Sequence, residues 1–243
     1  MLPLSLGHSA QTALTVLCLG AHADDIEIGC GGTLLSLLDQ TPRARVHWVV
    51  LSAARHRADE ARQSARAYLS SAHTRIDIHD VRDGFFPGEF SRLKAIFESL
   101  KASCNPDVIF THHRRDSHQD HRTVAELTHQ TFRDHLVFEY EIPKYDPDLG
   151  NPNLFVPLSQ EHADFKVAAL MQHFASQHGR AWFEPRTFYG LMRLRGMQAA
   201  APSGMAEAFH GPKLSLSFEP LPLHARTPSK QQHSVHVPEG GPA

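Results

Sequence analysis

The apolar residues of this chain follow two alternating patterns, and each pattern predicts a different kind of secondary structure. Short, nearly continuous apolar runs are typical of strands that are covered on both faces of a parallel sheet. Such runs predict strands at 12–20, 45–52, 74–80, 107–111 and 136–142. The run at 74–80 alternates Ile76 and Ile78 with polar residues, a pattern that also predicts a strand.

Between these strands, apolar residues recur every three or four positions, which is the period of an amphipathic helix. The clearest case is the segment 90–101, where Leu93, Ile96, Phe97 and Leu100 share one face. The same period predicts further helices at 57–69, 122–133, 159–177 and 187–197, and one that follows Gly31-Gly32 and runs to about Asp39. A last strand is predicted at 213–218.

Strands alternate with helices along most of the chain, which predicts an α/β fold with a mostly parallel sheet and helices on both faces. We expect one domain over residues 1–219. The stretch 220–243 is rich in Pro, Ser, Gln, His and Gly, so we expect it to be disordered. Residues 143–157 are rich in Pro, Asp, Asn and Gly and predict a long loop of the kind that forms lids and binding sites.

The composition narrows the class of protein. Among 243 residues, 24 Lys and Arg balance 26 Asp and Glu, so no basic surface for nucleic acid is expected. Three cysteines fit a reducing compartment better than a disulfide framework. No apolar run reaches the ~20 residues of a membrane span, and no Lys or Arg precedes Arg43 as a secretory signal requires. We therefore expect a cytoplasmic protein without stable membrane insertion.

Two polar clusters follow two of the predicted strands. His22-Ala23-Asp24-Asp25 follows the first strand, and the segment 112–121, which ends in His118-Gln119-Asp120-His121, follows the strand at 107–111. Ligands bind at the carboxyl ends of the strands in parallel α/β sheets. A catalytic zinc ion takes three protein ligands, commonly His nitrogens and a carboxylate oxygen, and keeps one position open. We therefore expect the two loops to meet and hold one metal ion.

The residue types leave some roles open. One of Asp24 and Asp25 can ligate the metal while the other accepts a proton from the attacking water, yet either can instead cap the next helix. The glycines at 29, 31 and 32 do not match the dinucleotide-binding spacing, and the preceding carboxylates would repel a pyrophosphate. Close packing of the helix on the sheet is the more fitting explanation for them.

Both clusters resemble the signatures of a known family. The segment 22–34 is similar to the first signature of the LmbE-like, or PIG-L, de-N-acetylases, and 112–121 is similar to the second. The segments 141–146, 195–196 and 206–209 also resemble bacterial members. The resemblance implies a Rossmann-like three-layer fold and a zinc-dependent hydrolase that removes acetyl groups from N-acetylglucosamine-type sugar conjugates.

The resemblance also implies roles for six residues. It implies a Zn²⁺ ion, for which another divalent metal can substitute, ligated by His22, Asp25 and His121. Asp24 would be the general base, His118 would stabilise the oxyanion or protonate the leaving amine, and Asp120 would orient His118. Family sequences usually have Pro where this chain has Ala23, which loosens the loop and removes no ligand.

Several residues keep two interpretations. Arg57 and Glu60 either bind sugar hydroxyls or form a solvated, salt-bridged helix face. Asp116 is a helix cap or a substrate contact, and Tyr145 either closes over substrate or belongs to a plain surface loop. His112 and His113 either line the pocket or lie outside it, while Cys30 is a thiolate ligand or, as we favour, a buried structural thiol.

The expected partner is a small N-acetylated sugar conjugate, and family members are often homo-oligomers. Two other functions stay open at this stage. The first is a metal-dependent amidase or deacylase for a non-sugar N-acyl substrate. The second is a sugar- or nucleotide-binding module whose catalytic site has decayed.

Overall fold

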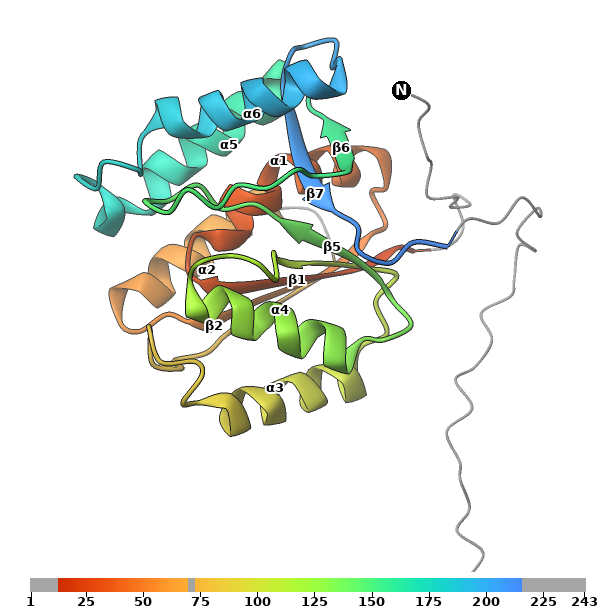
Figure 1. The fold of residues 1–243 in the computed structure, drawn as a ribbon, viewed down its shortest axis with the longest axis vertical. Helices are drawn as coiled ribbons and strands as arrows, with labels where there is room; N and C mark the ends of the chain where they lie inside the picture. Colours follow the sequence, from red (N-terminus) through yellow and green to blue (C-terminus); the bar gives the residue numbers. More distant parts are fainter. Residues whose placement is uncertain (1–12, 70–72, 216–243) are drawn as a thin grey trace, which may run out of the picture.

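A seven-stranded sheet forms the centre of the computed structural model, which describes residues 13–69 and 73–215 (Figure 1). The strand order is β3-β2-β1-β4-β5-β7-β6. The first five strands are parallel, and β7 is antiparallel to both β5 and β6. The strands are β1 (Thr15–His22), β2 (Arg45–Ser52), β3 (His73–Ile78), β4 (Val108–His112), β5 (Leu136–Tyr140), β6 (Leu154–Pro157) and β7 (Ala206–His210). The predicted mostly parallel sheet is confirmed.

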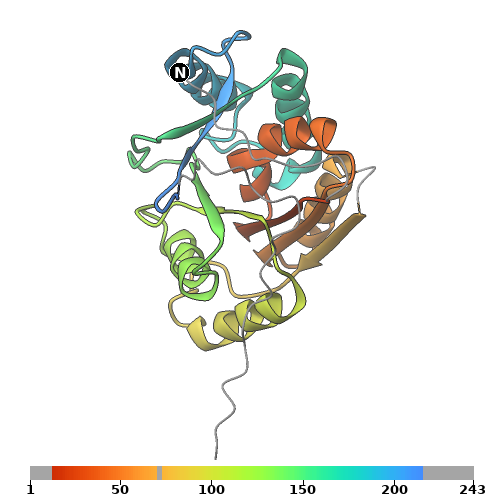
Figure 2. The same cartoon turned by 90° about the vertical axis from the view of Figure 1, so that its right-hand side faces the viewer.

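Helices cover both faces of this sheet, so the predicted three-layer α/β architecture is also confirmed (Figures 1 and 2). Helices α3 and α4 pack on one face, while α1, α2, α5 and α6 pack on the other. The helices are α1 (Asp25–Gln40), α2 (His56–Tyr68), α3 (Phe90–Ser103), α4 (Gln119–Thr131), α5 (Gln160–His173) and α6 (Pro185–Ala199). A 3₁₀ turn at Ala175–Gln177 follows α5. None of the helices in the described residues is long and apolar enough to span a membrane.

The central strand β1 explains why its sequence is continuously apolar. Val16 and Cys18 point into the core under α1 and α5, whereas Leu17 and Leu19 belong to the core under α3 and α4. All four side chains are fully buried. Because successive strand residues point to opposite faces, a strand covered on both sides needs an apolar residue at every position.

The order of the strands brings the two polar clusters together. Strand β1 pairs with β2 on one side and with β4 on the other, so the chain reverses its direction of winding across the sheet between β1 and β4. Val16 is opposite Val108 and Cys18 is opposite Phe110. The carboxyl ends of β1 and β4 therefore lie side by side, which is where ligands bind in open α/β sheets.

Helix α1 starts earlier than the sequence pattern predicts. It begins at Asp25, immediately after β1, so Gly31-Gly32 lies inside the helix and not before it. Close packing explains these glycines: a Cβ atom on Gly29 would lie 2.3 Å from the Tyr140 ring, and one on Gly32 would lie 2.5 Å from Leu158. The helix can approach β5 and the β6–α5 loop only because these positions lack side chains.

A buried ion pair also holds α1 in place. Glu207 of β7 accepts hydrogen bonds from the backbone N–H groups of Gly32 (2.9 Å) and Thr33 (2.7 Å). Lys166 of α5 donates to the Ile28 carbonyl and to Glu207, both at 2.6 Å. Two elements far along the chain thus make hydrogen bonds to the backbone of α1, which carries Asp25 at its first turn.

The prediction fails at the two antiparallel strands. The segment 143–157 is not entirely loop, because β6 occupies its last four residues, and the strand β7 at 206–210 was not expected. Residues 213–215 form no strand, contrary to the strand expected at 213–218. Residues 216–218 and the expected disordered tail at 220–243 lie outside the described residues. Glu207, a buried charge within β7, interrupts the apolar pattern that would otherwise indicate this strand.

Adding a methyl group to Gly29 should destabilise the protein, whereas adding one to Gly190 should not. The Tyr140 ring cannot move away from Gly29 easily, because it is fully buried and its hydroxyl donates to the Leu19 carbonyl at 2.6 Å. We expect Gly29→Ala to lower the free energy of unfolding by about 1–3 kcal/mol, as overpacking does. Urea denaturation measures this change.

Gly190 provides the matched control, since it also lies within a helix, α6, but a Cβ atom there meets nothing within 4 Å. Gly190→Ala should raise the free energy of unfolding by about 0.5–1 kcal/mol, because Ala loses less backbone entropy in a helix. Equal effects of the two substitutions would show that the close approach of α1 to Tyr140 does not limit stability.

Candidate metal centre

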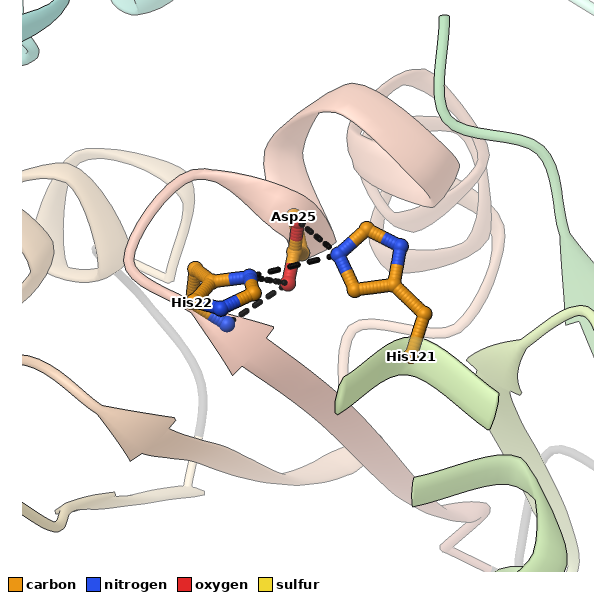
Figure 3. A group of neighbouring side chains, drawn as sticks. All are labelled: His22, Asp25 and His121. Carbon is orange, nitrogen blue, oxygen red and sulfur yellow. Dashed lines mark hydrogen bonds and ion pairs between the residues drawn. The ribbon is translucent and has the colours of Figure 1, made fainter. Parts of the chain in front are cut away.

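Three side chains from the two clusters converge at the carboxyl ends of β1 and β4 (Figure 3). His22 Nδ1 lies 3.2 Å from His121 Nε2. Asp25 Oδ2 is 3.5 Å from His22 Nδ1, and Asp25 Oδ1 is 3.6 Å from His121 Nε2. Tetrahedral zinc with bonds of about 2.0–2.2 Å needs ligand atoms roughly 3.3–3.6 Å apart. The three distances, two of which involve different oxygens of Asp25, lie close to the spacing of zinc ligands.

Local structure fixes each of these side chains. His22 is the last residue of β1, Asp25 is the first residue of α1, and His121 lies in the first turn of α4. The backbone N–H of His22 donates to Asp25 Oδ2 at 2.6 Å, which holds the carboxylate against the strand end. All three side chains are largely buried.

A carboxylate lies behind each of the two imidazoles. His121 Nδ1 is 2.9 Å from Asp116 Oδ2, on the side of the ring away from the convergence point. His22 Nε2 is 3.3 Å from Asp120 Oδ2 and 3.1 Å from Asp83 Oδ1. Metal-ligating histidines usually donate their second N–H to such a carboxylate, which fixes the tautomer and the ring orientation. The surroundings of both rings thus fit a bound cation.

The electrostatics at this point also favour a positive charge. Burial alone would lower the pKa of His22, but hydrogen bonds to Asp120, Asp25 and Asp83 outweigh it and raise the pKa well above its ordinary value. For His121, burial dominates and lowers the pKa to about 4, so this ring is neutral and its Nε2 is available as a ligand. A neutral imidazole nitrogen beside carboxylates is the donor set that zinc prefers.

Two other groups of side chains nearby are less suitable for a metal. His112, Asp116 and His121 lie close together, but the His112 and His121 rings stack at 3.9 Å with only 22° between their planes. In-plane lone pairs of stacked rings cannot meet at one ion. Lys144 also lies 3.0 Å from Asp116 Oδ1, where its charge would repel a cation held by that carboxylate.

In the second group, His22, His118 and Asp120, the Asp120 carboxylate and His118 Nδ1 accept several backbone hydrogen bonds. His118 Nδ1 accepts from the Asp120 backbone N–H at 3.2 Å. The Asp120 carboxylate accepts from the backbone N–H groups of Gly84 (2.6 Å) and Phe86 (3.1 Å). We therefore identify His22, Asp25 and His121 as the best candidate ligand set, the same three residues that the resemblance implies.

Asp24 occupies the N-cap position of α1 without a side-chain capping bond. Its Oδ1 instead accepts from Arg57 Nη2 at 3.0 Å, and the carboxylate is buried. Burial raises its pKa, although the Arg57 charge opposes this effect. Asp25 makes its backbone contact to His22 and not to α1. Neither carboxylate is used to cap the helix.

His118 and Asp120 lie next to each other and are joined by a hydrogen bond from the Asp120 backbone. The Asp120 carboxylate contacts His22 and the backbone N–H groups of Gly84 and Phe86, while the Asp120 backbone N–H donates to His118 Nδ1. The expected role of the Asp120 carboxylate toward His118 stays a prediction, and one of its oxygens lies within 4.8 Å of a His118 ring nitrogen. The His118 ring itself lies edge-on to His22, with a centroid distance of 4.9 Å.

The residues expected to bind substrate lie in different settings. Arg57 pairs with Asp24, and Glu60 accepts from the backbone N–H and hydroxyl of Ser176. Asp116 is buried behind His121, whereas Tyr145 is 72% exposed. The roles of these four residues toward substrate stay predictions. The contacts that Glu60 makes with Ser176, and Asp116 with His121, also hold parts of the fold together without any substrate.

The other cluster residues are placed as follows. His112 Nε2 accepts from the Ala21 backbone N–H at 2.9 Å, and this ring stacks on His121. His113 stacks on His210 at 4.0 Å, away from the three ligand atoms. Cys30 is buried within α1 and belongs to none of the three groups above, which agrees with a structural thiol.

Sequence reasoning missed two residues of the site. Asp83 follows β3 on the same edge of the sheet as the other clusters, and this position was a usable signal. Lys144 belongs to the segment 141–146 that resembles bacterial family members. A lone Lys in a Pro- and Asp-rich segment carries no sequence signal for a contact with Asp116.

Part of the chain matches a known protein family. Residues 17–132, which include both clusters, match the family model PIG-L, described as GlcNAc-PI de-N-acetylase. The "Uncharacterized deacetylase YaiS" of Escherichia coli (strain K12) is 26% identical over 185 residues, which are 71% of this chain and 97% of that protein.

Solved structures share the fold. N,N'-diacetylchitobiose deacetylase from Pyrococcus horikoshii has a TM-score of 0.60 at 20% identity, covering 82% of this chain and 83% of that one. GalB, the 4-carboxy-2-hydroxymuconate hydratase of Pseudomonas putida KT2440, has a TM-score of 0.65 at 17% identity, covering 85% and 99%. The match to the PIG-L, or LmbE-like, family model thus covers both clusters and just under half of the chain, and the likeness to the solved structures shows the fold.

Proposed function

We propose that this chain is a zinc-dependent hydrolase that removes the acetyl group from an N-acetylglucosamine-type sugar conjugate and releases acetate and a free amine. The observation that carries this proposal is the convergence of His22 Nδ1, Asp25 and His121 Nε2 at zinc-ligand spacing. A divalent ion held there would polarise the amide carbonyl and make a water molecule nucleophilic near neutral pH.

Asp24 is the residue best suited to accept the proton of the attacking water. It adjoins the ligand Asp25 in sequence, and its buried carboxylate is free of helix capping. Its raised pKa makes it a better base than an exposed Asp, while the ion pair with Arg57 keeps it ionised and fixes its orientation.

His118 is the residue best suited to act on the leaving group. Burial, and then the charge of His22, lower its pKa, so the ring is neutral near pH 7. Because its Nδ1 accepts from the Asp120 backbone N–H, the single ring proton lies on Nε2. An Nε2–H group beside His22 can donate a hydrogen bond to the developing oxyanion, whereas protonating the departing nitrogen would first require His118 to take up a proton.

The sugar substrate is supported by the family description and by the chitobiose deacetylase among the structures of the same fold. The alternative, a different reaction or a non-sugar acyl group on the same scaffold, is favoured by the likeness to a hydratase. The decayed binding module fits less well, because the candidate ligands, Asp24 and His118 are all present. The cytoplasmic location and the homo-oligomer stay predictions.

Replacing Asp24 by Asn should slow turnover and leave the metal bound. Asn keeps the size of the side chain and its contact with Arg57 but cannot accept a proton, so we expect kcat to fall by about 10²–10⁴-fold. Steady-state acetate release and zinc content by elemental analysis measure the two effects. Turnover at the wild-type rate would exclude Asp24 as the base.

Replacing His121 by Ala should abolish tight zinc binding, because one of three ligands is lost. His162 provides the control, since it pairs with Asp39 on α5 and α1, outside the three side-chain groups described above. Zinc affinity, measured by competition with a chromophoric chelator, should collapse in His121→Ala and stay unchanged in His162→Ala. Full zinc retention in His121→Ala would contradict the ligand set.

The substrate class is tested with a panel of acetylated amines. We expect acetate release from N-acetylglucosamine conjugates and little from N-acetyl amino acids, measured with the zinc-loaded protein and the Asp24→Asn variant as the blank. Preferential hydrolysis of the amino acid derivatives would favour the non-sugar deacylase instead.

A further inference from the structure

Lys144 is a buried cation next to the candidate metal centre that the proposed reaction does not use. Its side chain is 10% exposed, and its ammonium lies 3.0 Å from Asp116 Oδ1 and 2.5 Å from Asp148 Oδ2. It belongs to the loop between β5 and β6, which follows both candidate metal-binding clusters in the chain.

Asp116 connects this ammonium to a metal ligand. One carboxylate oxygen, Oδ1, accepts from the His118 backbone N–H at 2.8 Å and faces Lys144. The other oxygen, Oδ2, lies 2.9 Å from His121 Nδ1. A continuous line of contacts therefore runs from Lys144 through Asp116 to the ring whose Nε2 points at the convergence site.

The loop that carries Lys144 is anchored and not a free lid. The Ser117 backbone N–H donates to Asp148 at 2.6 Å, and Arg195 of α6 donates to the Gly150 carbonyl at 3.2 Å. Arg195 also forms a buried ion pair with Glu141, where the loop leaves β5. These contacts hold Lys144 in place even though neighbouring Tyr145 is exposed.

The second histidine of the site has no such cation behind it. His22 Nε2 faces the carboxylates of Asp120 and Asp83, and in the described part of the chain neither carboxylate is ion-paired with Lys or Arg. Asp120 is instead held by the backbone N–H groups of Gly84 and Phe86. Of the two histidines, His121 is therefore the one whose neighbouring carboxylate, Asp116, is ion-paired with a Lys. The positive charge of Lys144 offsets the negative charge that Asp116 places beside the His121 ring.

We propose that Lys144 is a positioning residue that acts through Asp116 on His121 and lowers the affinity of the site for its cation. The proposal rests on the metal site proposed above. Four carboxylates, Asp24, Asp83, Asp116 and Asp120, surround the three ligands, and a cation inside such a ring binds tightly unless some of their charge is offset. Arg57 offsets the charge of Asp24, and Lys144 offsets that of Asp116.

The direction of the effect separates this role from a merely structural one. If Lys144 only held Asp116 in place, its removal would weaken metal binding, since loss of an outer-shell partner usually costs 10–100-fold in affinity. If its charge is what matters, removal should tighten binding. A unit charge about 10 Å from an ion, at an effective dielectric constant of about 20, changes affinity on the order of tenfold.

The test is a zinc titration of the full chain in competition with a chromophoric chelator, at one pH and ionic strength. We expect Lys144→Met to bind Zn²⁺ about tenfold more tightly than wild type and Lys144→Arg to bind it as wild type does. Lys94→Met, which removes an equal charge from an ion pair with Glu98 on the surface of α3, should leave the affinity unchanged.

Weaker or equal zinc binding by Lys144→Met would overturn the proposal, as would equal tightening by Lys94→Met, which would indicate a general effect of net charge. His121→Ala in the same titration separates the two hypotheses: if it binds zinc like wild type, the metal site itself is wrong. Thermal unfolding without metal shows whether Lys144→Met is folded; if it is not, Lys144→Gln replaces it with the same expectation.

Discussion

The parallel pairing of β1 with β4 is the constraint on which the candidate site depends. This contact puts residues almost a hundred positions apart within 3.2 Å, because His22 ends β1 and His121 lies in the helix that follows β4. Any slip of this register would move the two imidazoles apart. The apolar core on both faces of β1 fixes this register. The packing of the sheet therefore determines how far apart the two imidazoles of the candidate site lie.

The position of helix α1 determines where Asp25, the candidate carboxylate ligand, lies. Asp25 is correctly placed only if α1 starts immediately after β1 and lies close against β5, and the glycines of the helix permit that approach. Glu207 and Lys166 then hold the helix from β7 and α5. The antiparallel end of the sheet therefore supports the site indirectly, because Glu207 of β7 holds the helix that carries Asp25. This contact gives the segment 206–209 a structural role.

The parallel part of the fold and the convergence of the three candidate ligands were predictable from the sequence, for physical reasons. Strands covered on both faces require continuous apolar runs, and loops that follow adjacent strands must meet. The strands β6 and β7 were not predictable, because they lie at the sheet edge and Glu207 breaks the apolar pattern. The contacts of Asp120, Asp83 and Lys144 depend on how separate loops dock, which spacing along the chain does not encode.

Charge balance around the site links these observations to function. The carboxylates hold two imidazoles in place and attract a cation, while Arg57 and Lys144 offset part of their charge. An anomalous-difference map at the zinc edge, from crystals of the zinc-loaded protein, examines this arrangement directly. We expect one strong peak about 2.0–2.2 Å from His22 Nδ1, an Asp25 oxygen and His121 Nε2. A peak between His112 and Asp116, or none near these residues, would contradict the proposed metal centre.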